Sequence, residues 1–179
     1  KKFCTSLRML MNSLCICFSM SCGAHAASWT DDVREKAEKG DPFAQTTLGF
    51  CYEIGEEVPL DAAMAANWYR KAAEQGWAGG MVRLGKCYAA GLGVPNDMEK
   101  AVQLWKKAAM IPASPHSVQD THVQEARAAL AHVLRLGLHG SKDVAGAISM
   151  AKSAAEWGLP EGEYELGMCY LEEGFIDKE

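Results

Sequence analysis

Ser149 and Lys152 are the residues whose spacing comes closest to a catalytic motif. The Ser-x-x-Lys pattern is typical of penicillin-binding enzymes, in which the serine attacks a cell-wall amide or a β-lactam. Neither partner motif of those enzymes, Ser-Asp-Asn or Lys-Thr-Gly, is present in the sequence. Because so short a pattern is common by chance, we expect Ser149 and Lys152 to be exposed polar residues, and we predict no catalytic residues.

Histidines and cysteines could hold a metal, but their spacing does not favour one. Histidines 116, 122, 132 and 139 include no pair at the i, i+4 spacing of a helical zinc site, so we predict polar surface residues. Cys51, Cys87 and Cys169 occupy one position of a recurring motif. Equivalent residues of adjacent helix pairs lie about 8–10 Å apart, farther than the Cα separation of about 7 Å that a disulfide tolerates. We therefore predict buried thiols, no metal and no cofactor.

The first 26 residues have the character of a targeting segment. They contain three basic residues and no acid, an apolar run of 14 residues at 9–22, and a small-x-small site at 24–26. This pattern is typical of a secretory signal peptide, and the apolar run is too short to span a bilayer comfortably. We predict a signal peptide at 1–26 with cleavage near Ala26, and a periplasmic or secreted location in a bacterium. A lipoprotein acylated at Cys22 is the alternative.

The composition favours helices and argues against a nucleic-acid partner. Of the 179 residues, 49% are hydrophobic and 23% are charged, with 18 Lys and Arg against 23 Asp and Glu. Loss of residues 1–26 would remove three bases and no acid, which changes the net charge from −5 to −8. An acid excess disfavours nucleic-acid binding. The 27 alanines, with few β-branched residues, favour helix over sheet.

Residues 27–179 contain an internal repeat. The motif Leu-Gly-x-Cys-Tyr occurs at 48–52, 84–88 and 166–170, and a divergent copy, Leu-Ala-His-Val-Leu, occupies 130–134. Successive copies are 36 residues apart, except that the third follows the second after 46. The chain therefore has one ten-residue insertion, which lies between Ala109 and Leu130.

Each repeat unit has the signals of two helices. In the first unit Asp41 and Pro42 suit the start of a helix, and Gly55 suits a left-handed end. Asp61 can cap a second helix, which Gly76 ends. Two helices per unit of about 36 residues predict an all-α fold, an α/α superhelical solenoid of helix-turn-helix repeats.

The repeat also resembles a known family. The motif Ala-x-x-x-Leu-Gly-x-x-Tyr-x-x-Gly at 44–55, followed by Ala-x-x-Trp-Tyr-x-Lys-Ala-Ala-x-x-Gly at 65–76, looks like the Sel-one-like repeat (SLR) family. The resemblance implies a superhelix akin to tetratricopeptide repeats that serves as a protein-binding scaffold. Secreted bacterial members of the family are linked to envelope assembly, regulation or host-cell contact.

The repeat register divides 27–179 into an array. We predict a half-unit at 29–40, repeats near 41–76, 77–112 and 123–158, and a partial repeat at 159–179. The third unit departs from the family motif because it has Ala131 and Leu134 in place of the glycine and the tyrosine. The last unit stops after its first helix, which indicates either a truncation or a capping helix.

Positions that vary between units are candidates for recognising a partner. Six such residues lie on the first helices, opposite the core face, and we predict that they bind a protein or peptide ligand on the concave surface: Phe50, Lys86, His132 and Met168 at one repeat position, and Glu53 and Arg135 at another. Large apolar residues there either form a contact patch or pack against a neighbouring helix.

The insertion is a second candidate region. Residues 110–116 include two prolines and cannot be helical throughout. Ser117 with Asp120, or Thr121, is predicted to cap an elongated first helix of the third unit. Such a loop either carries function or is simply tolerated.

These observations favour a non-catalytic protein-protein interaction scaffold in the bacterial envelope or in the secreted fraction. No membrane span and no nucleic-acid partner are expected. Two alternatives stay open. One is a secreted hydrolase of cell-wall or β-lactam material, as the resemblance to cysteine-rich relatives implies. The other is a secreted host-contact or virulence factor, which differs in its partner and not in its mechanism.

Overall fold

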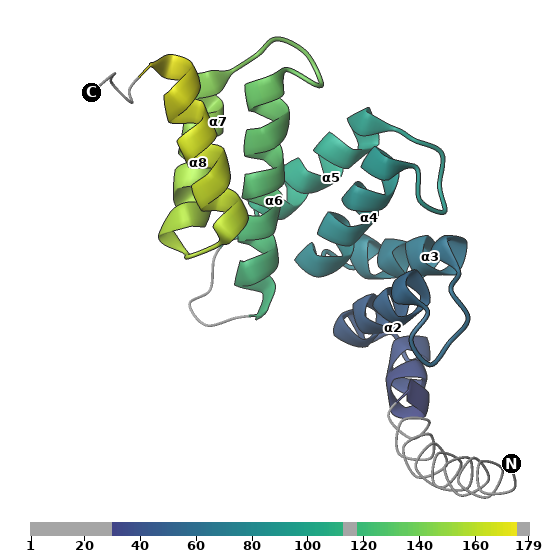
Figure 1. Ribbon diagram of the computed structural model, residues 1–179. Coiled ribbons are helices and arrows are strands. Elements are labelled where there is room, and N and C mark those ends of the chain that lie inside the picture. Colours follow the sequence, from purple (N-terminus) through teal and green to yellow (C-terminus); the bar gives the residue numbers. More distant parts are fainter. Residues whose placement is uncertain (1–29, 113–117, 175–179) are drawn as a thin grey trace, which may run out of the picture.

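The computed structural model describes residues 30–112 and 118–174, and all the regular elements within these ranges are helices (Figure 1). The chain is helical over residues 30–38. The helices that follow are α2 (Pro42–Ile54), α3 (Ala62–Glu74), α4 (Ala78–Ala90), α5 (Met98–Ala109), α6 (Val118–Leu136), α7 (Val144–Glu156) and α8 (Pro160–Glu173). The predicted signal peptide lies outside the described residues.

The helices pack in pairs, and the pairs follow one another from the purple N-terminal end to the yellow C-terminal end in Figure 1. Each first helix contacts its own second helix: α2 packs on α3, α4 on α5, and α6 on α7. The first helices also contact each other in series, α2 with α4, α4 with α6, and α6 with α8. The predicted all-α helical solenoid is therefore confirmed.

Local capping explains where these helices begin and end. The carboxylates of Asp41 and Asp61 accept hydrogen bonds from backbone amides three residues later, at 2.7 and 2.9 Å, as predicted for N-caps. Asp97 and Asp143 do the same for α5 and α7. Helix α2 ends at Gly55, whose φ of +72° is the left-handed conformation that favours glycine.

Small residues let each helix pair approach closely. A Cβ added to Gly49 would lie 2.7 Å from the ring of Tyr69, so the glycine makes room for that buried side chain. Gly85 makes room for Trp105 in the same way one repeat later. The third repeat has Ala131 at the glycine position and Ala151 at the aromatic position, and both are fully buried in one cluster. The size of the residue on one helix thus compensates for the residue on the other.

The insertion lengthens α6, as predicted. This helix has 19 residues, whereas the neighbouring helix α7 has 13. Ser117 lies outside the described residues. Thr121 lies inside the helix, so the prediction that it caps α6 is wrong, whereas the cap formed by Ser117 with Asp120 stays a prediction. Within the described ranges, no helix is both long enough and apolar enough to cross a membrane.

Candidate functional site

The residues predicted to bind a partner lie on one series of helices, which we call the first-helix face: α2, α4, α6 and α8. Phe50 and Glu53 lie on α2, Lys86 on α4, His132 and Arg135 on α6, and Met168 on α8. These helices contact each other in series, and the predicted residues on α2, α4 and α6 contact the next first helix.

The N-terminal junction, between α2 and α4, consists of Phe50, Glu53 and Arg83. The Arg83 guanidinium lies over the Phe50 ring, 4.8 Å from its centroid, and its Nη1 is 3.6 Å from Oε2 of Glu53. The hydroxyl of Tyr69 donates a hydrogen bond to the same carboxylate. Burial, together with that carboxylate, raises the pKa of Tyr69 well above its usual range. The junction is only half-buried, since the side chains of Arg83 and Glu53 are 29% and 34% exposed.

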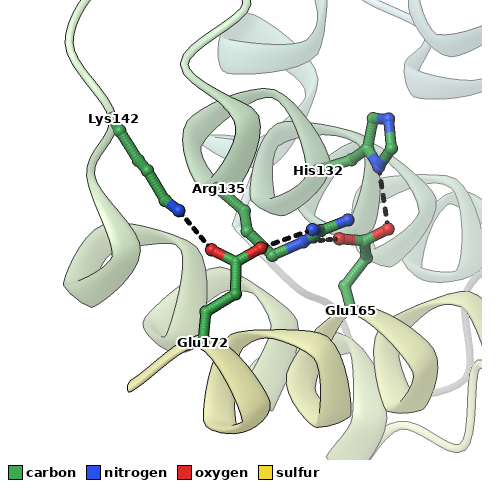
Figure 2. A network of polar contacts seen from close by, with 5 residues as sticks. All are labelled: His132, Arg135, Lys142, Glu165 and Glu172. Atoms are coloured by element: carbon green, nitrogen blue, oxygen red, sulfur yellow. Dashed lines mark hydrogen bonds and ion pairs between the residues drawn. The ribbon is translucent and has the colours of Figure 1, made fainter. Parts of the chain in front are cut away.

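The C-terminal junction, between α6 and α8, consists of His132, Arg135 and Glu165 (Figure 2). The Nε of Arg135 donates to Glu165 at 2.9 Å, and Nδ1 of His132 lies 2.8 Å from the other oxygen of that carboxylate. The side chains of Arg135 and Glu165 are only 5% and 7% exposed. The hydrogen bond to Glu165 raises the pKa of Arg135, so its charge is fixed.

A second carboxylate extends this network toward solvent. Glu172 accepts a hydrogen bond from Nη1 of Arg135 at 2.8 Å and also forms an ion pair with Lys142 (Figure 2). Hydrogen bonds from Lys142 and then from Arg135 hold the pKa of Glu172 below its usual range. Lys142 comes from the loop between α6 and α7, so the network joins α6, this loop and α8.

The burial of Arg135 corrects one prediction. Its repeat position was expected to face away from the core, yet its side chain is enclosed between α6 and α8. Val82 and Ala128, which lie four residues before Lys86 and His132 on the same side of their helices, are also buried. The reason is that adjacent first helices pack side by side, so residues opposite the core of one pair touch the next pair. Arg135 therefore joins two helices and does not present its charge to solvent.

The two junctions are related by the repeat. Glu53 and Arg135 are 82 residues apart, and so are Arg83 and Glu165. The same two positions thus carry an ion pair at both ends of the array, with the signs exchanged. This relation could have been found in the sequence by aligning each first helix with the next one. Arg83 and Glu165 are absent from the predicted set because their role depends on the preceding first helix and not on their own repeat unit.

The middle junction, between α4 and α6, has no ion pair at these positions. The residues in register with Glu53 and Arg83 are Ala89 and Ala129. Both line a pocket of about 410 Å³ that opens between α4, α5, α6 and α8. Its apolar lining is Ala89, Met98, Trp105, Ala128, Ala129, Val133 and Leu138, and its polar lining is Lys86, Glu125, His132, Glu161 and Glu165. The pocket therefore includes two of the predicted residues, Lys86 and His132.

Glu125 and its neighbours form one edge of the pocket. Its carboxylate lies 3.5 Å from Nζ of Lys86 and 3.6 Å from Nδ1 of His122. Burial alone would raise the pKa of Glu125, but the attraction of His122 and Lys86 outweighs burial and lowers it. His122 is itself largely buried, so the prediction of a surface histidine is wrong at this position. Glu125 was absent from the predicted residues and is recognisable only once α4 and α6 are placed together.

The residues with possible chemistry elsewhere have ordinary surroundings. Ser149 and Lys152 are both exposed on α7, as predicted. Cys51, Cys87 and Cys169 are buried, which confirms the prediction of buried thiols. Burial raises the pKa of Cys87 to about 11, so this thiol is protonated at neutral pH. In residues 30–112 and 118–174, no three histidine, cysteine or acidic side chains gather as a metal site would require.

Comparison with known proteins gives one family and two similar structures. The Sel1 repeat family matches at residues 42–77, 78–110 and 160–178. The crystal structure of c5321, described as a protective antigen of uropathogenic Escherichia coli strains with an SLR fold, superposes with a TM-score of 0.68 at 28% identity. A Sel1 repeat protein from Oxalobacter formigenes superposes with a TM-score of 0.66 at 23% identity.

The similarity covers most of this chain but only part of those proteins. The matches include 79% and 80% of this chain, which correspond to 28% and 39% of the two larger chains. No curated protein sequence matches the chain. The family matches stop at residue 110 and resume at 160, so the pair α6 and α7 lies outside them although it folds as the other pairs do.

Proposed function

Because the chain carries three Sel1 repeats in an SLR fold, we propose that it is a non-catalytic scaffold that binds a segment of a partner protein on its first-helix face. Sel1 repeats generally mediate protein-protein interaction. The observation that carries the proposal is a contrast between positions. Framework positions such as the capping aspartates keep their residue from repeat to repeat, whereas the position of Phe50 becomes Lys86, then His132, then Met168. Repeat proteins present an extended surface for binding, and positions that vary along one face are suited to recognise a particular partner.

Location in the bacterial envelope or outside the cell is part of the proposal. Its support is the composition of residues 1–26, with three bases, no acid and a short apolar run before a small-x-small site. Fractionation of cells that express the full chain would test it. Recovery of the protein in the cytosol at its full length would contradict an exported location.

Site-specific photo-crosslinking would test the binding face. A benzophenone amino acid is placed at Lys86 or Met168 on the first-helix face, and at Lys106 or Lys152 on the second helices as matched controls. After incubation with envelope extract, we expect the same protein to be crosslinked from positions 86 and 168 and not from 106 and 152. Crosslinking from the second helices alone would overturn the proposed face.

Host contact is a second candidate, and one observation favours it. The c5321 structure, which is similar over most of this chain, is that of a protective antigen. Detection of the protein in culture supernatant, with binding to host-cell surface proteins, would favour this partner over an envelope component. A hydrolase remains the other alternative. Hydrolysis of peptidoglycan or a β-lactam by the chain, lost in Ser149→Ala, would replace the scaffold proposal with that activity.

A further inference from the structure

We infer that the pocket of the middle junction receives an apolar side chain of the partner together with a neighbouring lysine or arginine. This inference rests on the proposed binding function and names the chemistry of the ligand at one place on the first-helix face. It is carried by three observations: how the pocket arises in the repeat, what forms its floor, and which charges surround it.

The pocket exists because the repeat omits a side-chain pair there. At the two other junctions, a long charged residue from each helix fills the space between adjacent first helices. At the middle junction both residues are alanines, Ala89 and Ala129, and the space opens into a pocket of about 410 Å³. That volume is within the range of about 300–1,000 Å³ typical of ligand sites. The pocket is thus a position that the chain itself fills elsewhere.

The floor of the pocket fits an apolar group. Besides the two alanines, it includes Met98, Val133 and the ring of Trp105. The indole nitrogen of Trp105 already donates to the carbonyl of Val82 at 3.3 Å, so the side chain offers carbon surface to a ligand. A ligand that places an apolar side chain here removes this surface from water and does not bury an unpaired indole nitrogen.

The charges at the rim favour a cation beside that apolar group. Three glutamates line the pocket against one lysine. Lys86 already lies near Glu125, and Glu165 is paired with Arg135. Glu161, which is exposed in the first turn of α8, has no ion pair among the described residues. A basic side chain of the partner would complement this carboxylate, whereas an acidic one would be repelled.

A variant that restores the omitted pair fills the pocket. Ala89→Arg/Ala129→Glu copies the residues of the C-terminal junction, and Lys86 then lies beside the new glutamate as His132 lies beside Glu165. Ala129→Leu fills the same space with an apolar side chain and no charge, so it serves as a second filled variant. Glu161→Gln keeps the shape of the rim and removes its unpaired charge. Circular dichroism and thermal unfolding establish that each variant is folded.

The probe is a phage-displayed library of random 12-residue peptides, panned on the full chain. We expect enriched peptides that share a large apolar residue next to a lysine or arginine. In fluorescence anisotropy, filling the pocket should weaken the affinity of the chain for these peptides by at least about tenfold. Glu161→Gln should weaken the affinity for the same peptides by about three- to tenfold. Replacement of the basic residue of the peptide by glutamine should remove the effect of Glu161→Gln.

The outcomes separate this inference from the proposed function. Enriched peptides that bind the filled variants as tightly as the original chain, but lose binding in Phe50→Ala/Lys86→Glu, would overturn the pocket and keep the binding face. Enrichment of acidic peptides, or of basic peptides unaffected by Glu161→Gln, would overturn the charge assignment. A library that yields no binding peptide would count against the proposed function itself.

Discussion

The N-terminal and C-terminal junctions use the same two repeat positions with opposite charges and at different depths. At the N-terminal junction the carboxylate is on the earlier helix and the guanidinium on the later one, and both are about one-third exposed. At the C-terminal junction Arg135 precedes Glu165, and both are almost completely enclosed. Where the repeat carries charged residues at both of these positions, their charges are complementary, but the repeat does not fix which sign each position carries.

The surroundings of each pair explain its polarity. Arg83 at the N-terminal junction is placed between an aromatic ring and a carboxylate, which both attract a cation. Arg135 at the C-terminal junction has a second acceptor in Glu172, while Glu165 has a second contact in His132. Each charge is thus set by a neighbour outside the pair. The two ion pairs therefore occupy equivalent repeat positions, but each depends on different neighbouring side chains.

The largest expected difference between the junctions concerns the loss of one charge. Arg135→Ala leaves Glu165 buried without its main partner, and breaking a buried pair in this way costs about 3–5 kcal/mol of the free energy of unfolding. Arg83→Ala removes the equivalent charge from a half-exposed pair, and the cost there is about 1 kcal/mol or less. Urea unfolding followed by circular dichroism measures both values.

A third variant separates charge from packing at the C-terminal junction. Arg135→Met/Glu165→Leu replaces the buried pair by apolar side chains, and we expect it to recover most of the stability that Arg135→Ala loses. Equal losses for Arg135→Ala and Arg83→Ala would show that burial does not distinguish the two junctions.

The next effect contrasts the glycines of the first helices. Gly85→Ala places a methyl group against the ring of Trp105, and overpacking of this kind costs about 1–3 kcal/mol. Gly167→Ala is the matched control in α8, where nothing lies within 4 Å of the added carbon. There the better helix propensity of alanine should stabilise the protein by up to about 1 kcal/mol.

Thermal unfolding of the two glycine variants would show shifts of opposite sign. If both variants lower the midpoint, the glycine at this repeat position is needed for a reason other than the facing aromatic ring. The same outcome would remove the explanation offered for Ala131, which faces Ala151 in the third repeat.

The sequence predicts the features that depend on nearby residues and not those that depend on a distant helix. Helix caps such as Asp41 and Gly55 involve residues only a few positions away, and the residue type alone indicates an N-cap or a left-handed C-cap. The third repeat diverges in sequence because its glycine and its aromatic residue change together, yet its spacing still predicts a helix pair. Burial of Arg135 could not be predicted in this way, since it depends on a helix 30 residues later in the chain.

No sequence motif predicts the pocket of the middle junction. Ala89 and Ala129 are unremarkable alanines in an alanine-rich sequence, and they gain meaning only as the counterparts of two ion pairs. The missing ion pair becomes evident only when the two other junctions are known to have one. That comparison requires knowing that adjacent first helices touch.

A smaller effect tests the aromatic neighbour at the N-terminal junction. Phe50→Leu keeps an apolar side chain but removes the ring beneath Arg83, and an exposed contact of this type contributes about 0.5–1 kcal/mol. A double-mutant cycle with Arg83→Met isolates the coupling between the two side chains. Coupling near zero would mean that Phe50 is available to a partner at no cost to the fold.

The smallest expected effect is the pH dependence of the C-terminal junction. Lys142 and Arg135 lower the pKa of Glu172 in the folded chain, whereas in the unfolded chain the carboxyl has its ordinary value of about 4.3. A lowered folded pKa means that the unfolded state binds more protons in acid. The stabilising contribution of Glu172 is therefore complete above about pH 4.3 and is lost as the pH falls through the folded value.

Glu172→Gln should isolate this contribution. The difference in the free energy of unfolding between the original chain and Glu172→Gln should be constant near neutral pH and should disappear in acid, in urea titrations at low salt. In Lys142→Met the first of the two hydrogen bonds is absent, so the pKa of folded Glu172 rises toward its ordinary value, and the contribution becomes smaller and is completely lost at a higher pH. A difference that persists unchanged into acid would mean that Glu172 acts through its shape and not its charge, and the C-terminal junction would then reduce to the buried pair alone.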